Sequence, residues 1–296
     1  MSSIKTVTLV GGSGSLGSVV LQKLLASEFD VQVIRRTGSK ATFPDTVKVV
    51  DVDISSVEAL TAALTGQDAV VSTVSDFLAQ IPLIDAALAA GVKRILPSEF
   101  GCDLDHPKVA QLPVFGHKVQ VVNYLREKCP GSALSYTLVR NCAFLDWGVQ
   151  YNFIINYSEY KPSVFGSGDT TFSATSLASV ADAVVGVLRK PEETKDRAVY
   201  VEDTKLTQNK LVEIGKQVAP EKPWAVTSAN LDDVTAAADA RLAKGIIDAE
   251  TMVPYLFRAI FDESYGSNWE KTDNELLGLK GKTDDEVAAI VKQYIK

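Results

Sequence analysis

The sequence predicts an α/β protein built around a doubly wound parallel sheet. In the first 140 residues, short apolar runs rich in β-branched side chains alternate with longer amphipathic stretches. The apolar runs show little polar alternation, which is expected of parallel strands that are covered on both faces. A glycine-rich turn at residues 11–17 joins the first apolar run to the first amphipathic stretch. Repeated strand–helix–strand units of this kind favour a parallel sheet with helices on both sides.

Six apolar runs are predicted to be the strands of this sheet, with helices between them. The strands are 7–10, 31–34, 47–52, 69–72, 94–96 and 135–139. The helices are the segment whose Leu16, Val19, Val20 and Leu24 share one face, residues 56–64 and residues 80–90. Gly91 directly follows the last of these, where a glycine is a natural helix C-cap.

After residue 150 the pattern loosens. Residues 176–190 are expected to form one more helix and residues 197–203 one more strand. The rest is predicted to be mostly helical, with helices at 207–217, 230–244, 248–261 and after Thr283. Thr283-x-x-Glu286 is a capping-box pattern, which supports a helix start at that point.

These elements suggest two regions. We expect residues 1–150 to form the main domain, with residues 176–203 returning to it. Residues 151–175 and 204–296 are expected to form a smaller, mostly helical region. That region would pack against the carboxyl ends of the strands, where ligands of such sheets bind.

The composition argues against nucleic acids and membranes as partners. The 296 residues include 30 Lys and Arg against 37 Asp and Glu, a formal net charge of −7, so there is no broad positive field for phosphate backbones or anionic lipids. No apolar run approaches the roughly 20 residues of a membrane span. The N-terminus lacks the pattern of a signal peptide. We therefore expect a cytoplasmic protein that acts on a small molecule, as a monomer or a homodimer.

The three cysteines are expected to be reduced. Cys102, Cys129 and Cys142 are far apart and show no metal-ligand spacing. An odd number of cysteines without a CxxC pair is typical of free thiols in a reducing compartment. The sequence predicts no metal site.

The sharpest motif is GGSGSLG, which comprises Gly11, Gly12, Ser13, Gly14, Ser15, Leu16 and Gly17. It satisfies GxGxxG, follows a predicted strand at once and opens a predicted helix. In that context the glycines allow a sharp turn and a close approach of the pyrophosphate to bare backbone N–H groups. The helix start adds free donors and a partial positive charge. The motif therefore predicts a dinucleotide-binding domain of the Rossmann type, although a glycine-rich turn without a ligand would look the same.

The end of the second strand indicates which dinucleotide is bound. Enzymes that use NAD place an Asp or Glu there for the ribose hydroxyls, whereas this sequence has Arg35 and Arg36. Two guanidinium groups suit the 2′-phosphate of NADP(H), and Lys40 would add a third positive charge. The alternative is a solvated basic turn. The pattern favours NADP(H).

Three further residues are assigned to the cofactor on topology alone. Asp53 ends the third strand, where it would contact the adenine or simply begin an acidic loop. Thr73 and Val74 follow the fourth strand and would pass under one of the ribose rings.

Lys118 is the candidate for acid–base chemistry. It lies early in a predicted helix whose buried face carries Val114, Val121, Val122 and Leu125. In short-chain dehydrogenases this helix carries Tyr-x-x-x-Lys, but the tyrosine position here is Val114. A second Tyr-x-x-x-Lys at Tyr157 and Lys161 follows the sixth strand instead of preceding it and is cut off by Pro162. The second pair is therefore not expected to be catalytic.

Several segments together resemble a known family. IPLIDAALAAGVKRILPSEFG, VFGHKVQVVNYL, LSYTLVRNCAF and the glycine turn are similar to the isoflavone reductase-like proteins. That group includes phenylcoumaran benzylic ether reductases and belongs to the NmrA-like atypical short-chain dehydrogenases. The resemblance covers residues 4–190. It is thinner after residue 200, where the sequence is similar in character to fungal members of the family.

The resemblance implies that Lys118 is the general acid/base of a hydride transfer, or that it binds the nicotinamide ribose, or both. It also points to Asn141 and Phe144, which follow the sixth strand, as pocket residues. Ser98 ends the fifth strand, where its hydroxyl would touch the substrate or the nicotinamide amide, or else cap the following turn, and Trp147 is an aromatic candidate for the pocket wall. A lysine needs a pKa roughly three units below its usual 10.4 to act as a base near neutral pH, and burial can supply that shift. Family members often carry an arginine four residues after the lysine, where this chain has Val122.

The function expected from these features is an NADPH-dependent reduction of a small aromatic metabolite of phenylpropanoid, isoflavonoid or polyketide type. Two of five aromatic residues are expected to line the substrate pocket, the candidates being Trp147, Tyr151, Phe153, Phe165 and Phe172. The alternative is a regulatory protein of the NmrA-like type that senses NADP(H) without turnover. Retention of Lys118 favours the enzyme.

Overall fold

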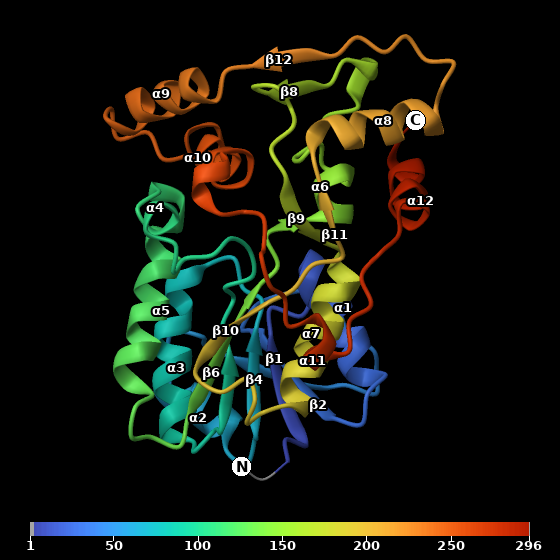
Figure 1. Ribbon diagram of the computed structural model, residues 1–296. Helices are drawn as coiled ribbons and strands as arrows, with labels where there is room; N and C mark the ends of the chain where they lie inside the picture. Colours follow the sequence, from blue (N-terminus) through green and yellow to red (C-terminus); the bar gives the residue numbers. More distant parts are fainter. Residues whose placement is uncertain (1–2, 296) are drawn as a thin grey trace.

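The computed structural model describes residues 3–295, which form a parallel sheet and a smaller region above its carboxyl edge (Figure 1). The main sheet has seven strands in the order β10-β6-β5-β4-β1-β2-β3. Their bounds are β1 Thr6–Val10, β2 Asp30–Arg36, β3 Lys48–Val52, β4 Ala69–Ser72, β5 Arg94–Leu96, β6 Ser135–Arg140 and β10 Arg197–Tyr200. Every pairing in this sheet is parallel, for example Val7 with Val31 and with Ala69. This is the Rossmann order with one strand added at the β6 edge.

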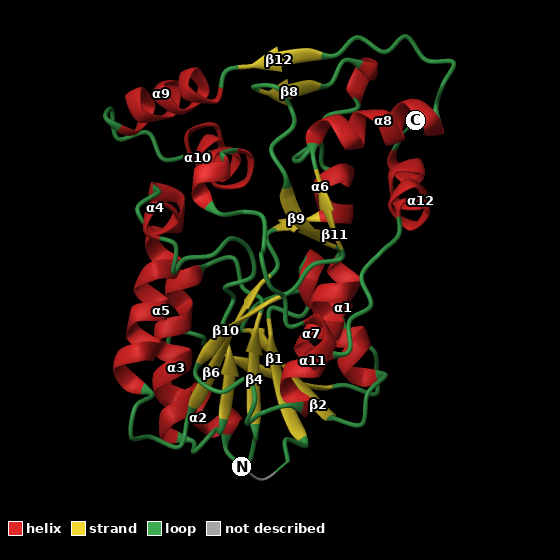
Figure 2. Cartoon of the chain, in the orientation of Figure 1, coloured by secondary structure: helices red, strands yellow, loops and turns green. Residues whose placement is uncertain are grey.

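Helices cover both faces of the sheet, as Figure 2 shows. One face is covered by α2 Val57–Leu64, α3 Gln80–Ala89 and α5 Gly116–Lys128, and the other by α1 Ser15–Leu25, α7 Leu177–Arg189 and the short α11 Asn274–Leu277. The side chains between helices and sheet are almost entirely aliphatic. Because both faces are buried, the strands read as continuous apolar runs and not as alternating ones.

The smaller region contains five α-helices and two small sheets within the described part of the chain. The helices are α6 Leu145–Gln150, α8 Gln208–Val218, α9 Leu231–Leu242, α10 Ala249–Phe261 and α12 Asp284–Tyr294. One sheet joins β7 Ala143–Phe144, β9 Phe172–Thr175 and β11 Thr204–Leu206, and the other joins β8 Ser163–Phe165 and β12 Thr227–Ala229. Short connecting helices are α4 Pro107–Ala110, η1 Phe77–Ala79, η2 Pro113–Phe115, η3 Ser158–Tyr160 and η4 Glu263–Tyr265.

The predicted α/β fold is confirmed, with corrections beyond residue 140. The predicted strand at 197–203 ends at Tyr200, and β11 then pairs antiparallel with β9. The region expected to be mostly helical also contributes β8, β9, β11 and β12 to the two small sheets, and these strands are too short to leave a periodic signal. The capping box at Thr283 and Glu286 is present, with both reciprocal hydrogen bonds. Among residues 3–295, no helix combines the length and apolar character needed to cross a membrane.

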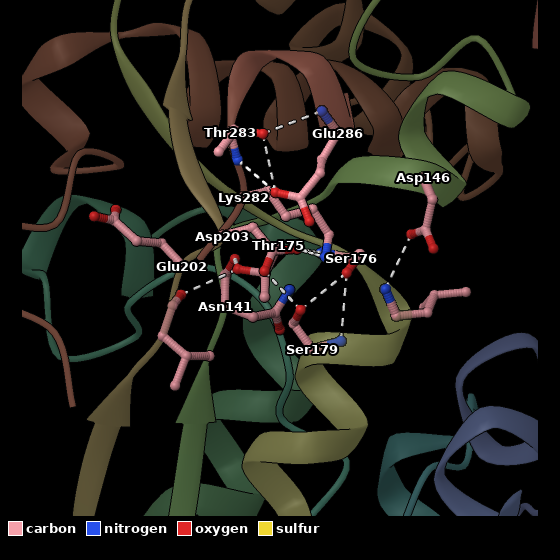
Figure 3. A network of polar contacts seen from close by, with 12 residues as sticks. Asn141, Asp146, Thr175, Ser176, Ser179, Glu202, Asp203, Lys282, Thr283 and Glu286 are labelled. Atoms are coloured by element: carbon pink, nitrogen blue, oxygen red, sulfur yellow. Dashed lines mark hydrogen bonds and ion pairs between the residues drawn. The ribbon is translucent and has the colours of Figure 1, made fainter. Parts of the chain in front are cut away.

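A buried carboxylate joins the sheet to the smaller region (Figure 3). Asp203 accepts hydrogen bonds from the Ser176 backbone N–H at 2.8 Å and from the Ser179 hydroxyl at 2.6 Å, both at the start of α7. Lys282 Nζ lies 3.6 Å from the same carboxylate, and the Lys282 backbone N–H donates to the Asp203 carbonyl at 2.7 Å. Asp146 accepts from the Leu177 N–H at 3.0 Å. Two carboxylates therefore fix the first turn of α7 beneath the smaller region.

Candidate active site

The glycine-rich turn is packed so tightly that two of its glycines leave no space for a side chain. Gly11 follows β1 with a φ of +87°, and a Cβ there would lie 2.8 Å from the carbonyl carbon of Thr73. A Cβ on Gly17 would overlap the carbonyl oxygen of Gly11. Only glycine fits either position, because real Cβ atoms do not approach backbone so closely. The turn therefore presents bare backbone where β1 meets α1.

The start of α1 offers unpaired donors. Its N-cap residue is Gly14, which has no side chain to accept a hydrogen bond, and the first turn contains no acidic residue. The first N–H groups of a helix have no partner within the helix and carry a partial positive charge. The bare turn and the open helix start together fit the pyrophosphate of a dinucleotide. All the predicted residues from Gly11 to Gly17 lie in this segment.

The two predicted arginines differ in their surroundings. Arg35 Nε and Nη2 donate to the Asp51 carboxylate at 2.6 and 2.7 Å, and Nη1 donates to the Ala41 carbonyl at 2.8 Å. The hydrogen bonds between them raise the pKa of Arg35 and lower that of Asp51. Arg35 thus has a partner on β3, which the basic pattern by itself does not reveal.

Arg36 and Lys40 carry positive charges that have no ion-pair partner among residues 3–295. They lie at and just beyond the end of β2, the strand that pairs with β1. Arg36 is exposed at the end of β2, and Lys40 is exposed just beyond a turn in which the Ser39 N–H donates to the Arg36 carbonyl at 2.9 Å. Neither side chain has a hydrogen bond or an ion pair with any residue from 3 to 295. These are the two cations that remain available to a 2′-phosphate.

Two other residues predicted to bind the cofactor are engaged within the chain. Asp53 Oδ1 accepts from the Ser55 N–H at 3.0 Å and the Ser55 hydroxyl at 2.6 Å, which begins the loop before α2. These bonds lower the pKa of Asp53. Thr73 Oγ1 donates to the Val10 carbonyl at 3.1 Å and so supports the glycine turn from beneath.

A cavity of about 350 Å³ lies between the glycine turn and the smaller region. Its lining is largely apolar and aromatic and comprises Ser15, Leu16, Phe77, Phe100, Gly101, Cys102, Val114, Phe115, Lys118, Cys142, Ala143, Phe144, Trp147, Phe153, Leu177, Leu256 and Ile260. Lys118 is the one charged residue in this lining. The first turn of α1, the predicted catalytic lysine and helix α10 thus meet at one hollow.

Lys118 is held by two backbone carbonyls. It lies in the first turn of α5, and its Nζ donates to the Glu99 carbonyl at 2.7 Å and to the Phe100 carbonyl at 2.9 Å. The Phe77 ring lies 5.0 Å from Nζ, within range of a cation–π interaction. Burial of the ammonium group lowers its pKa to about 8. An ammonium group has three N–H donors, so one remains for a third acceptor.

A buried ion pair behind Lys118 was not expected from the sequence. Glu99 and Arg140 are 1% and 0% exposed, and their carboxylate and guanidinium form an ion pair between the loop after β5 and the end of β6. Arg140 Nε also lies 3.7 Å from Asp103 Oδ1. Burial lowers the pKa of Arg140 to about 10. The pair fixes the backbone at Glu99, whose carbonyl accepts a hydrogen bond from Lys118 Nζ.

The structure brings two of the four predicted pocket residues into the cavity. Phe144 and Trp147 line it. Ser98 does not, because its hydroxyl donates to the Val74 carbonyl at 2.7 Å and its N–H to Gln80 Oε1 at 2.6 Å. Asn141 is fully buried, and its side-chain amide donates to the Cys142 carbonyl at 3.2 Å.

The five aromatic candidates separate into lining and packing residues. Trp147 and Phe153 line the cavity, with ring centroids 5.7 Å apart. Tyr151 is 56% exposed and packs on Trp147 at 5.0 Å. Phe165 borders a different, more open hollow, and Phe172 is buried against Phe261. Two of the five therefore reach the cavity.

The second Tyr-x-x-x-Lys motif lies away from the cavity. The Tyr157 hydroxyl donates to the Leu211 carbonyl at 2.6 Å within the core of the smaller region. Burial raises the pKa of Tyr157 far above its usual value. Lys161 is exposed, 3.5 Å from Glu159. In the described part of the chain, no three His, Cys, Asp or Glu side chains are grouped as metal ligands would be.

Residues 3–227 match the model of the NmrA-like family. A relative from Aspergillus flavus, named oxidoreductase aprR, is 32% identical over 296 residues, which cover 96% of this chain and 98% of the relative.

Solved structures of the same architecture cover nearly the whole chain. The structure of AtPrR2 with NADP+ and (+)pinoresinol has a TM-score of 0.80 and 23% identity, and covers 99% of each chain. The crystal structure of an isoflavone reductase has a TM-score of 0.78 and 18% identity, and covers 99% of this chain and 100% of its own.

Proposed function

The chain belongs to the NmrA-like family, as its motifs predicted, and on this premise we propose that it is an NADPH-dependent reductase of a small aromatic metabolite. The observation that carries the proposal is the shared cavity, in which the first turn of α1 and Lys118 face the same hollow. Two relatives support it: the Aspergillus flavus protein is named an oxidoreductase, and AtPrR2 was solved with NADP+.

The cofactor would be held by the glycine turn and the basic end of β2. The N–H groups at the start of α1 would receive the pyrophosphate. Arg36 and Lys40 would receive the 2′-phosphate, and Arg35 would join them only by leaving Asp51. When bound, NADPH supplies the hydride of the reaction.

Lys118 would donate a proton to an oxygen atom of the substrate. With two of its N–H groups on the Glu99 and Phe100 carbonyls, Nζ keeps a third proton for a substrate oxygen. A pKa of about 8 leaves it protonated at neutral pH yet acidic enough to transfer that proton. The same ammonium would also serve to bind the nicotinamide ribose.

The substrate would be uncharged over most of its surface and flat in part. Phe100, Phe144, Trp147 and Phe153 give the cavity aromatic walls, and Lys118 is its one charged lining residue. Phenylpropanoid, isoflavonoid or polyketide-like molecules have this character. We assign substrate binding to residues 151–175 and 204–296, because they contribute Phe153 and, from helix α10, Leu256 and Ile260 to the lining of the cavity.

Cofactor preference tests the first half of this proposal. A fluorescence titration with NADPH, NADP+ and NADH is expected to show at least about tenfold tighter binding of NADPH than of NADH, because Arg36 gives the 2′-phosphate a charge-assisted partner. Arg36→Ala should remove most of that preference and leave NADH binding unchanged. Arg189→Ala, an exposed arginine at the far end of α7, is the matched control and should bind as the wild type does.

Other outcomes would redirect the proposal. Equal affinity for all three cofactors would contradict the assignment of Arg36, and failure to bind any of them would contradict the assignment of residues 11–17. Tighter binding of NADP+ than of NADPH would favour a regulatory protein that senses the oxidised cofactor.

Measurement of turnover tests the second half of the proposal, which is the role of Lys118 in the reduction. In a screen of aromatic ketones, enones and benzylic ethers followed by loss of NADPH absorbance, Lys118→Ala should abolish turnover. It should still bind NADPH, with an affinity lowered only by the loss of one contact to the nicotinamide ribose. Lys128→Ala, an exposed lysine at the end of the same helix, should remain active. Because the protonated lysine is the proton donor, the rate of reduction should fall as pH rises above about 8. An active Lys118→Ala variant would remove this residue from the mechanism.

A further inference from the structure

Two of the three cysteines share the cavity with Lys118. Cys102 follows β5 and Cys142 follows β6, so neighbouring strands deliver them to the same edge of the sheet. They are 6% and 3% exposed, and both line the cavity. The reductase mechanism proposed above gives neither thiol a role.

The backbone holds these two residues against each other. The Cys142 N–H donates to the Gly101 carbonyl at 2.9 Å, which fixes Cys142 beside the residue that precedes Cys102. Cys142 has a φ of +51°, in the left-handed region that non-glycine residues seldom adopt. Such backbone strain persists only where the surroundings enforce it and often accompanies a functional site. The two side chains interact closely enough for each to shift the pKa of the other.

The two thiols are chemically different. The hydrogen bond from Cys142 and the nearby Lys118 ammonium lower the pKa of Cys102. Burial and the neighbouring Cys102 sulfur raise the pKa of Cys142 well above its usual value. The thiolate is the nucleophilic form of cysteine, so Cys102 is the attacking thiol of the pair.

Cys129 supplies an internal reference. It lies at the end of α5 and packs into the core between that helix and the sheet, outside the cavity lining. Burial raises its pKa to about 11. A reagent that enters through the cavity and reacts with thiolates should therefore modify Cys129 more slowly than Cys102 and Cys142.

We propose that Cys102 and Cys142 form a peroxide-reactive thiol pair that closes to a disulfide inside the active-site cavity. The Cys102 thiolate attacks one peroxide oxygen, the O–O bond breaks, and the departing hydroxide takes up a proton to become water. The Cys142 thiol then attacks the resulting sulfenic acid sulfur, the S–O bond breaks, and a second water leaves. The two thiols lose two electrons, which the peroxide gains.

Oxidation would alter the cavity directly. It removes the free Cys102 thiol that interacts with Lys118, and it ties the loop after β5 to the turn after β6. Both loops line the cavity, so closure of the disulfide is expected to reduce binding of a ligand there. The disulfide itself does not depend on the proposed reductase activity, because it can be measured on the protein without any substrate.

Peptide mapping of the intact chain provides the test. The reduced protein is treated with a small excess of hydrogen peroxide, blocked with N-ethylmaleimide and digested with trypsin. Arg94, Lys108, Lys128 and Arg140 are cleavage sites that place the three cysteines on separate peptides. We expect a cross-link between the Cys102 and Cys142 peptides, a mass loss of about 2 Da that dithiothreitol reverses, and an alkylated Cys129.

Variants identify the attacking thiol. Cys142→Ser should stop at a sulfenic acid on Cys102 that dimedone traps, whereas Cys102→Ser should react with peroxide at least about tenfold more slowly. Cys129→Ser should form the cross-link as the wild type does. Oxidation of Cys129 first, a cross-link that includes Cys129, or three thiols that react at equal rates in the wild-type chain would overturn the proposal, whether or not the variants fold.

The rate of cross-linking with and without NADPH tests the thiol pair separately from the proposed reductase function. If NADPH occupies the cavity, saturating NADPH should slow formation of the cross-link. A cross-link that forms equally fast with and without NADPH would count against NADPH binding in the cavity and leave the thiol pair established.

Discussion

Lys118 carries its charge at a cost, because burial opposes the ammonium form. Its pKa is lowered from 10.5 to about 8. Below pH 8 the lysine is protonated in both the folded and the unfolded chain, and the cost of burying the charge is fully present. Between about pH 8 and 10.5 the unfolded chain binds the proton that the folded chain has lost, so the stability of the folded chain rises with pH.

A stability measurement can detect this effect without a substrate. Relative to Lys118→Met, the free energy of unfolding of the wild type should increase by about 1.4 kcal/mol per pH unit from pH 8 towards 10.5, and by about 3 kcal/mol in total. Urea unfolding of both proteins at pH 7, 8, 9 and 10 measures the difference. Lys128→Met, at an exposed position, should show no such slope. A constant difference between wild type and Lys118→Met would mean that the lysine is not desolvated.

At the scale of elements, the strand–turn–helix unit β1–α1 depends on a contact between two parts of one turn. Gly17 lies in the first turn of α1 and faces the carbonyl of Gly11, which leaves no space for a methyl group. The helix therefore packs closely on the sheet and keeps its free N–H groups beside the cavity.

Gly17→Ala should force these two parts of the turn apart. We expect a destabilisation of about 1–3 kcal/mol from overpacking and a loss of NADPH affinity of at least about tenfold, because the N–H groups of α1 move. Gly116→Ala is the control, since a Cβ at the start of α5 meets open space. Thermal unfolding and NADPH titration measure the two effects. Wild-type affinity in Gly17→Ala would show that the turn does not hold the cofactor.

At the scale of the whole molecule, Asp203 joins two regions that are far apart in the sequence. It stands between β10 and β11, pairs with the start of α7 and faces Lys282 from the segment before α12 (Figure 3). Its side chain is 2% exposed, so water does not replace a lost partner.

Asp203→Asn keeps the volume of the side chain and removes one acceptor and the charge. An amide group would turn its donors towards the Ser176 N–H or the Ser179 hydroxyl, and Lys282 would lose its counter-charge. The expected destabilisation is about 1–3 kcal/mol. Glu127→Gln, at an exposed site, should stay within about 0.5 kcal/mol of the wild type. Equal midpoints of urea unfolding for Asp203→Asn and the wild type would contradict this account of how the regions are joined.

The sequence alone determined the local features of this protein. Continuous apolar runs were sufficient for the six strands before residue 141, and the spacing of apolar positions was sufficient for the helices between them, because local backbone preference and burial act in the same direction there. The glycines of residues 11–17 predicted a tight turn, since a left-handed φ and a close backbone contact both require glycine. Lys118 was identified through motifs that surround it in the chain.

Only the tertiary structure decided which distant groups are partners. Arg35 and Asp51 are paired because β2 lies beside β3, and Glu99 meets Arg140 because β5 lies beside β6. The same adjacency brings Cys102 to Cys142. The small sheets of β7, β9 and β11 and of β8 and β12 arise from strands of two to four residues, which are stabilised by their neighbours and not by their own pattern. Long-range packing has no local signature, so these contacts appear only once the chain is folded.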